Sequence, residues 1–260
     1  SSEQIILNPD DSVKRKYQAE YKAYINRQRK IYELLSEPSV TKDGVEILLK
    51  ANVGQLGDVE QAVKNNSYGV GLYRTEFAYL TRRTFPTENE LYESYSEAAA
   101  KLKGKPMVIR TIDLGGDKIS HLTSNNIEQN PELGWRAIRI SLECKELFIT
   151  QLRAILRTAA SSSSNQISIL FPMISSMEEL LEAKRILAEI KEQMIKEGVS
   201  VPEKLRIGMM VEVPSVAIMA GIYAKEVDFF AIGSNDLVQY TLAVDRTNPK
   251  VTHLYKPTNP

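Results

Sequence analysis

Residues 167–179, ISILFPMISSMEE, join an apolar run to a proline and then to a helix start. The mostly apolar run Ile167–Phe171 suits a strand that is covered on both faces. Pro172 ends this run, and Ser176 with Glu179 forms the pattern of a helix-capping box. The stretch therefore predicts a strand followed directly by a helix, which is the repeating unit of a parallel α/β fold.

The same unit recurs along the chain, and Thr87 with Glu90 marks a second capping box. The candidate strands are Ile47–Val53, Tyr68–Tyr73, Pro106–Ile109, Ile167–Phe171, Arg206–Val211 and Phe229–Ile232. About six strand–helix repeats predict an α/β fold, either a TIM-type (β/α)8 barrel or an open doubly wound sheet. No seventh or eighth strand is recognisable before Pro260, so we expect a barrel to be incomplete.

The N-terminal segment has a different pattern. Apolar residues recur at helical spacing from Val13 to Leu35, the acidic pair Asp10–Asp11 can cap the start, and Pro38 ends the pattern. We therefore expect residues 1–40 to form a lead-in or linker helix and residues 41–260 to form the barrel domain.

Composition excludes several classes of protein. The 33 basic and 33 acidic residues cancel, which argues against general nucleic-acid binding. Cys144 is the sole cysteine, so an intrachain disulfide is impossible and a reducing compartment is the default. We expect no membrane insertion and a cytoplasmic location, because no apolar run is long enough to span a bilayer or to form a signal peptide. Cys144 falls on a predicted helix, Ala137–Phe148.

Polar side chains follow the apolar strands at the points where these strands end. The second and third strands lead into Arg74 and Arg110, the fifth into Glu212, and the sixth into Asn235 and Asp236. Because the C-terminal ends of parallel barrel strands converge on one face, we expect these side chains to surround a single site.

The types of residue in this set suggest an anionic, metal-chelating substrate. Guanidinium groups match phosphate oxygens, and Arg246 could add a third cation to Arg74 and Arg110. Paired carboxylates suit a hard divalent cation, and we expect Mg²⁺. The alternative is that each charge is a solvated residue or part of a structural ion pair, as single charges at strand ends often are.

Four ordered stretches are similar to the motif blocks of the Enzyme I family of bacterial sugar phosphotransferase systems. They are residues 69–77 (GVGLYRTEF), 110–118 (RTIDLGGDK), 133–139 (LGWRAIR) and 232–237 (IGSNDL). The likeness extends over almost the whole chain. Pyruvate phosphate dikinases and phosphoenolpyruvate synthases share the barrel and parts of these blocks.

The resemblance implies a role for each candidate residue. Phosphoenolpyruvate would contact Arg74, Arg110, Asn235, Asp236 and Arg246. Glu212 and Asp236 would ligate Mg²⁺, and Arg136 would act catalytically on the reacting phosphoryl and enolate oxygens. In that family the phosphoryl group passes to a histidine on an N-terminal domain and then to the carrier protein HPr. A homodimer is also implied.

Some features depart from the family pattern. Glu132 stands where phenylalanine is usual, and we expect it to pair with Arg136 and to weaken that residue's contact with substrate. The phosphohistidine domain and the family's enolate-protonating cysteine have no counterpart, so the chain alone is not expected to complete the reaction. Two alternatives remain: a fragment of a dikinase- or synthase-like enzyme, or a non-catalytic phosphoenolpyruvate-binding regulator.

Overall fold

The computed structural model describes residues 5–35, 37–115, 130–162 and 166–259. The chain divides into two compact units, which are described separately. One unit comprises Ser1–Leu49 with Lys64–Asn66, and the other comprises Lys50–Val63 with Ser67–Pro260.

Helix α1 (Asp11–Leu34) dominates the first unit and confirms the predicted N-terminal helix. The side chain of Asp10 caps it by accepting hydrogen bonds from the backbone N–H groups of Ser12 and Val13. None of its residues is buried, although its apolar positions include several tyrosines. The helix is therefore held mainly by local interactions within this unit.

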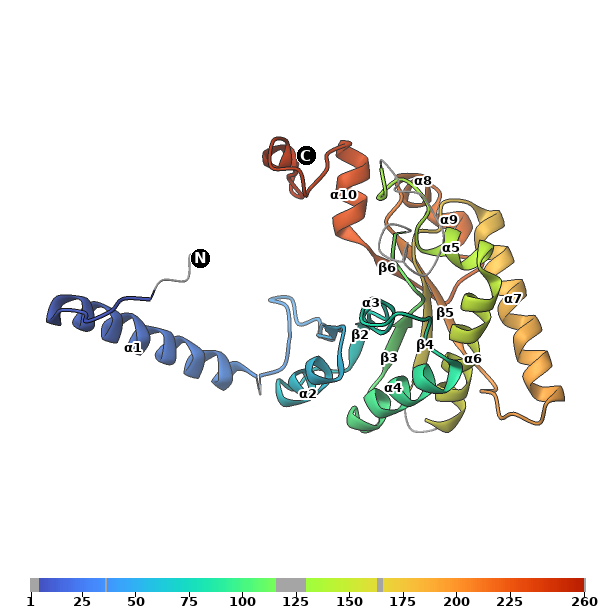
Figure 1. The fold of residues 1–260 in the computed structure, drawn as a ribbon, viewed down its shortest axis with the longest axis horizontal. Helices are drawn as coiled ribbons and strands as arrows, with labels where there is room; N and C mark the ends of the chain where they lie inside the picture. The colour runs from blue at the N-terminus through green and yellow to red at the C-terminus, as the bar shows by residue number, and fades with distance from the viewer. Residues whose placement is uncertain (1–4, 36, 116–129, 163–165, 260) are drawn as a thin grey trace. The chain divides into compact units, whose positions relative to one another are not determined.

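The second unit contains one sheet of six parallel strands. These are β1 (Ala51–Val53), β2 (Val70–Tyr73), β3 (Met107–Arg110), β4 (Ile167–Phe171), β5 (Arg206–Val211) and β6 (Phe229–Ile232). Each strand pairs with its neighbour in the sequence, so the spatial order is β1-β2-β3-β4-β5-β6 (Figure 1). A doubly wound sheet reverses its strand order part-way, whereas a barrel does not. The fold is therefore an incomplete TIM-type α/β barrel, a curled sheet with β1 and β6 at its edges.

Helices connect the strands and cover one face of the sheet. They are α2 (Leu56–Lys64), α3 (Phe77–Leu80), α4 (Glu88–Lys101), α5 (Ile138–Glu143), α6 (Lys145–Ser161), α7 (Met177–Lys196), α8 (Pro214–Ile218), α9 (Ala220–Tyr223) and α10 (Ser234–Leu242), with a short 3₁₀ helix at Thr252–Leu254. Helix α6 packs between α4 and α7 (Figure 1). Both predicted capping boxes are present, at Thr87 and at Ser176. Among the described helices, none has the length and apolarity needed to cross a lipid bilayer.

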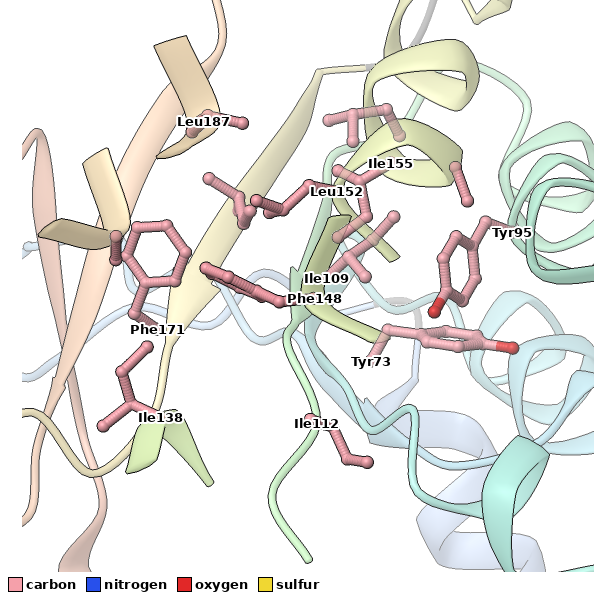
Figure 2. Close-up of a cluster of buried hydrophobic side chains, with 14 of the residues drawn as sticks. Tyr73, Tyr95, Ile109, Ile112, Ile138, Phe148, Leu152, Ile155, Phe171 and Leu187 are labelled. Carbon is pink, nitrogen blue, oxygen red and sulfur yellow. The ribbon is translucent and has the colours of Figure 1, made fainter. Parts of the chain in front are cut away.

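The main core lies between the sheet and these helices. The ring of Phe148 on α6 meets that of Phe171 on β4 edge to face, with 6.1 Å between ring centroids (Figure 2). Tyr73 and Tyr95 make a similar contact at 5.8 Å between β2 and α4. These pairs anchor the outer helices on the strands whose ends carry the candidate site.

A smaller apolar cluster covers the opposite face of the sheet and consists of Val108, Leu170 and Met210. Side chains two residues apart on a strand share a face. Arg110 therefore continues the row of Val108, and Glu212 continues the row of Met210. This alternation directs both charged side chains toward the interior of the half-barrel, where the predicted site should lie.

Several predicted boundaries were wrong. The first strand begins at Ala51 rather than Ile47, because Ile47, Leu48 and Leu49 are exposed and β1 pairs with β2 only from Ala51 onward. The second strand begins at Val70 rather than Tyr68. The third is shifted by one residue, since Pro106 has no N–H to offer to the ladder.

The predicted helix Ala137–Phe148 is two helices, α5 and α6. Cys144 separates them with φ −90° and ψ 68°, which lies outside the α-helical region. Its side chain is half-buried and packs against the main core. Cys144 is therefore a packing residue at the junction between α5 and α6, not a residue within a helix.

Candidate active site

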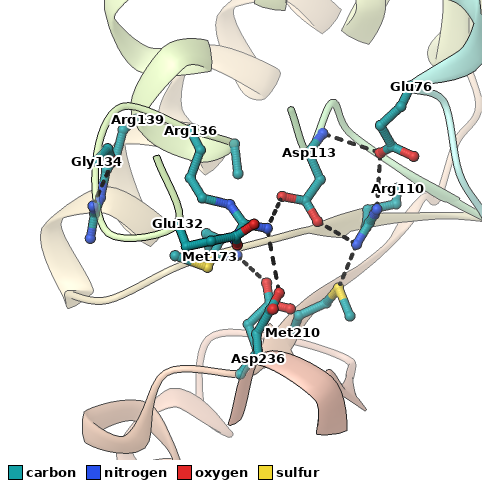
Figure 3. Close-up of polar contacts among 12 residues, drawn as sticks. Glu76, Arg110, Asp113, Glu132, Gly134, Arg136, Arg139, Met173, Met210 and Asp236 are labelled. Carbon is teal, nitrogen blue, oxygen red and sulfur yellow. Dashed lines mark hydrogen bonds and ion pairs between the residues drawn. The ribbon is translucent and has the colours of Figure 1, made fainter. Parts of the chain in front are cut away.

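A series of alternating acidic and basic side chains crosses the C-terminal ends of the strands. Its members, in order, are Glu76, Arg110, Asp113, Arg136, Asp236 and Arg246. Figure 3 shows the series from Glu76 to Asp236. The structure thus brings together four of the residues selected from sequence, Arg110, Arg136, Asp236 and Arg246, although they are far apart in the chain.

Arg110, the last residue of β3, is almost fully buried. Its guanidinium donates to Glu76 Oε1 at 2.9 Å and pairs with Asp113 Oδ2 at 2.6 Å. It also donates to the sulfur of Met210 on β5, at 3.6 Å. Burial lowers the pKa of Arg110, but the charges of Asp113 and Glu76 outweigh burial and raise that pKa above its ordinary value. Arg110 is therefore a permanently charged group held in one orientation.

Gln151 on α6 fixes the backbone around Arg110. Its side chain accepts a hydrogen bond from the N–H of Ile112 at 3.0 Å and donates to Thr75 Oγ1 at 3.1 Å. Thr75 in turn donates to the carbonyl oxygen of Arg110 at 3.1 Å. All of these groups are buried, so this network rigidly connects the ends of β2 and β3.

Arg136 lies two residues before the start of α5 and donates to acidic groups from three segments. Nη2 contacts Asp113 Oδ1 at 2.9 Å and Asp236 Oδ2 at 3.4 Å. Nη1 contacts the carboxylate of Glu132 and, at 3.3 Å, the hydroxyl of Tyr240. Burial opposes the charge, yet Asp113 and Asp236 raise the pKa of Arg136 well above its ordinary value. The expected pairing of Glu132 with Arg136 is confirmed.

Glu212 follows β5 and is 1% exposed. Its Oε1 accepts a hydrogen bond from the N–H of Met173 at 2.6 Å. Burial, with the charge of Asp113 next in size, raises the pKa of Glu212 to about 7. A Cβ atom at Gly233 would lie 2.4 Å from Glu212 Oε2. The glycine at the end of β6 therefore leaves the space that this carboxylate occupies.

Asp236 lies in the first turn of α10, directly after β6. Its Oδ1 accepts from Arg246 Nη1 at 2.8 Å, while Oδ2 contacts Arg136. The backbone N–H of Arg246 donates to Gln239 Oε1 at 3.1 Å, which fixes the segment after α10. Asp236 is thus shared by two arginines from different parts of the chain.

Arg74 and Asn235 stand apart from this series. Arg74 follows β2, is exposed, and borders a small cavity of about 180 Å³ together with Tyr73 and Ser94. Asn235 is exposed, and its backbone carbonyl accepts a hydrogen bond from the hydroxyl of Tyr255. Within the described residues, neither side chain joins the ion-pair series. The substrate-binding roles of Arg74 and Asn235 therefore remain predictions.

No group of three or more His, Cys, Asp or Glu side chains among the described residues is arranged to hold a metal ion by itself. The negative charges of Asp113 and Asp236 nevertheless both raise the pKa of Glu212, so these three carboxylates are close enough to interact. Such an all-oxygen set fits Mg²⁺, which commonly takes one or two protein carboxylates and completes its shell with water and substrate oxygens.

Comparison with known proteins identifies the family. Residues 28–260 match the family model described as "PEP-utilising enzyme, PEP-binding domain". The chain belongs to the PEP-utilising enzymes.

Relatives from several bacteria are similar over nearly the whole chain. The phosphoenolpyruvate-protein phosphotransferase of Bacillus subtilis (strain 168) is 45% identical over 256 residues, which are 98% of this chain and 44% of that protein. The corresponding protein of Enterococcus faecalis is 43% identical over 259 residues, again covering 98% of this chain and 44% of the relative. The chain therefore spans less than half the length of these relatives. Among solved structures, malate synthase of Haloferax volcanii matches 62% of this chain and 40% of its own, with a TM-score of 0.34 and 12% identity, too low to support an inference.

Sequence reasoning overlooked several groups that shape the candidate site. Glu76 and Asp113 stand close to Arg74 and Arg110 in the sequence, so their nearness to strand ends was a usable signal. Gln151 lies within a helix, and Tyr240 lies four residues after Asp236. Neither residue stands at the end of a strand, so a search of strand ends could not identify them. All four fix the orientation of an arginine or of the backbone beside it.

Backbone strain next to Arg136 leads to a stability prediction. Ala137 is fully buried, with φ 52° and ψ −123°, a conformation that glycine adopts more readily than alanine. In Ala137→Gly, relief of this strain should offset the lost methyl packing, and we expect the free energy of unfolding to change by less than about 1 kcal/mol. Ala154→Gly, at a fully buried position within α6, should lose roughly 1–2 kcal/mol. Urea unfolding measures both, and equal losses would contradict the strain argument.

Proposed function

We propose that this chain binds phosphoenolpyruvate together with Mg²⁺ and presents its phosphoryl group for transfer to a histidine on a separate N-terminal domain. From there the group would pass to HPr and support sugar uptake. The observation that carries this proposal is the ion-pair series at the C-terminal strand ends, where Arg110, Arg136 and Arg246 converge on Asp113 and Asp236. The phosphotransferase names of the relatives support it over a dikinase or a synthase.

The arginines would recognise the two anionic groups of the substrate. Each guanidinium offers parallel N–H donors that match phosphate or carboxylate oxygens. Arg110 and Arg246 are already oriented by carboxylates of the protein, so little ordering would be needed on binding. Exposed Arg74 and the amide of Asn235 would complete the set from the β2 and β6 ends.

Glu212 and Asp236 would hold Mg²⁺ from the ends of β5 and β6. When bound, Mg²⁺ would draw negative charge from the phosphoryl and enolate oxygens. Arg136 would provide further positive charge to the same oxygens from a buried, preorganised position, which is the arrangement that stabilises developing charge most effectively. We therefore assign Arg136 the catalytic role and the other arginines a binding role.

The remaining features of the proposal concern the context of the domain. Residues 1–40 would act as a linker helix before the barrel domain of residues 41–260, consistent with the absence of buried residues on α1. The lone cysteine supports a reducing, cytoplasmic setting. Homodimerisation is proposed from the resemblance alone.

Calorimetric titration with phosphoenolpyruvate tests the binding step on this chain. We expect binding with Mg²⁺ present and a loss of affinity of at least about tenfold when EDTA removes the metal, since Glu212 and Asp236 would then repel the substrate phosphate. A thermal melt with each titration shows that the sample is folded. Equal affinity with and without Mg²⁺ in a folded sample would refute the metal site, and no binding in either condition would refute the function.

A further inference from the structure

Glu132 adds a negative charge beyond those that already balance the three arginines of the ion-pair series. Arg110, Arg136 and Arg246 are already matched by Glu76, Asp113 and Asp236. Glu132 adds a third carboxylate to Arg136, and among the described residues it pairs with no second cation. Its side chain is 46% exposed, whereas those of Asp113 and Asp236 are 5% and 9% exposed. Of the three acids on Arg136, Glu132 is thus the one that can leave for solvent.

The loop that carries Glu132 is held in place from two sides. The hydroxyl of Tyr240 on α10 donates to the backbone carbonyl of Glu132 and accepts from Arg136 Nη1. Arg139 Nη1 donates to the carbonyl oxygens of Leu133 and Gly134, at 2.9 Å and 2.8 Å. Figure 3 shows the carboxylate of Glu132 beside the guanidinium of Arg136. The backbone of Glu132 is therefore held by the loop, and only its side chain has to move to release Arg136.

Resting on the anion-binding role proposed for Arg136, we propose that Glu132 is an internal competitor for the ligand anion at this arginine. A carboxylate offers the Nη1 donor the same oxygen geometry that a substrate phosphate or carboxylate would offer. Ligand binding at Nη1 then requires Glu132 to rotate into solvent. Because the Glu132 side chain is partly exposed, breaking its ion pair with Arg136 costs little free energy. Glu132 therefore lowers the affinity for the ligand without blocking the site.

Glu132→Gln tests the proposal, because glutamine keeps the shape of the side chain and removes its charge. We expect the dissociation constant for phosphoenolpyruvate with Mg²⁺ to fall about two- to fivefold, which is the range that partly exposed ion pairs support. Glu182→Gln is the matched control: Glu182 pairs with Arg185 on the outer helix α7 at 37% exposure, and its loss should leave the affinity unchanged. Glu132→Asp keeps the charge but shortens the reach, so it should behave as Glu132→Gln does.

Two further measurements separate competition from a structural effect of the loop. The gain should disappear in an Arg136→Gln background, and it should shrink at about 1 M salt, where exposed charges are screened. The inference is overturned if the wild type binds phosphoenolpyruvate and Glu132→Gln binds it no more tightly. It is also overturned if the gain in affinity persists both in the Arg136→Gln background and at high salt. Either result leaves the proposed function standing. If the wild type binds no phosphoenolpyruvate, the proposed function is refuted for the natural chain. Binding that then appears only in Glu132→Gln still supports the competitor, whereas no binding by either protein overturns both proposals.

Discussion

Replacing Arg110 with alanine is expected to weaken phosphoenolpyruvate binding by at least about a hundredfold. Loss of one partner from a buried, hydrogen-bonded charge pair typically costs a few kcal/mol, and each 1.4 kcal/mol corresponds to a factor of about ten in affinity. The Arg110 side chain is only 9% exposed, so water cannot easily replace it. Calorimetry with Mg²⁺ present measures the loss. A fall of less than about tenfold would show that Arg110 is not a main anion contact.

The same substitution should destabilise the fold, and this must be separated from the loss of binding. Without Arg110, Glu76 loses its ion-pair partner and Asp113 keeps only Arg136, a situation that costs roughly 3–5 kcal/mol for buried pairs. Adding Glu76→Gln to Arg110→Ala should restore part of the free energy of unfolding and none of the affinity. Arg153→Ala provides the matched control, because Arg153 pairs with Glu88 and Glu197 among the outer helices. It should lower stability and leave affinity unchanged.

The strand assignments show what the sequence could and could not determine about the fold. Ile167–Phe171, Arg206–Val211 and Phe229–Ile232 were predicted to the residue, because each run stops directly before a proline, a charged residue or a glycine, at Pro172, Glu212 and Gly233. The run from Ile47 failed because apolar composition does not say whether a partner strand is present. The apolar pattern of the sequence also could not decide between a barrel and a doubly wound sheet, because that choice depends on which strands are neighbours in space.

The candidate site shows a similar division. Strand-end positions predicted that Arg110 and Glu212 would lie at one face of the barrel, and the two-residue period of the observed strands accounts for their common direction. The pairing of each arginine was not predictable, because it depends on loops and helices: Asp113 lies in the loop after β3, and Gln151 reaches the same backbone from α6. The sequence also placed Arg74 at the correct strand end without indicating that it would be exposed.

A pH-dependent stability follows from the burial of Glu212. Burial and the charge of Asp113 raise the pKa of Glu212 from 4.5 to about 7, despite the hydrogen bond from Met173. The folded, metal-free chain therefore holds this proton more tightly than the unfolded chain does. The resulting stabilisation is fully present below the unfolded value near 4.5 and is lost as the pH rises through about 7. A shift of this size corresponds to roughly 3 kcal/mol, so most of that loss should fall between about pH 5 and pH 8.

Glu212→Gln should remove this dependence, because glutamine resembles the protonated acid and can still accept the hydrogen bond from Met173. Urea unfolding in EDTA should show the wild type losing stability toward pH 8 relative to the variant, which should be the more stable protein there by up to about 3 kcal/mol. The same variant should lose the Mg²⁺ dependence of phosphoenolpyruvate binding, since a neutral amide is a poor ligand for a hard cation. Glu182→Gln, at a partly exposed site on α7, should keep the wild-type pH profile. If the wild type and Glu212→Gln lose stability in parallel across this range, the buried carboxylate is not the titrating group. A gain in stability at pH 8 together with lost metal dependence would mean that Glu212 is kept charged at a cost to the fold, and metal binding is the chemistry that would account for that cost.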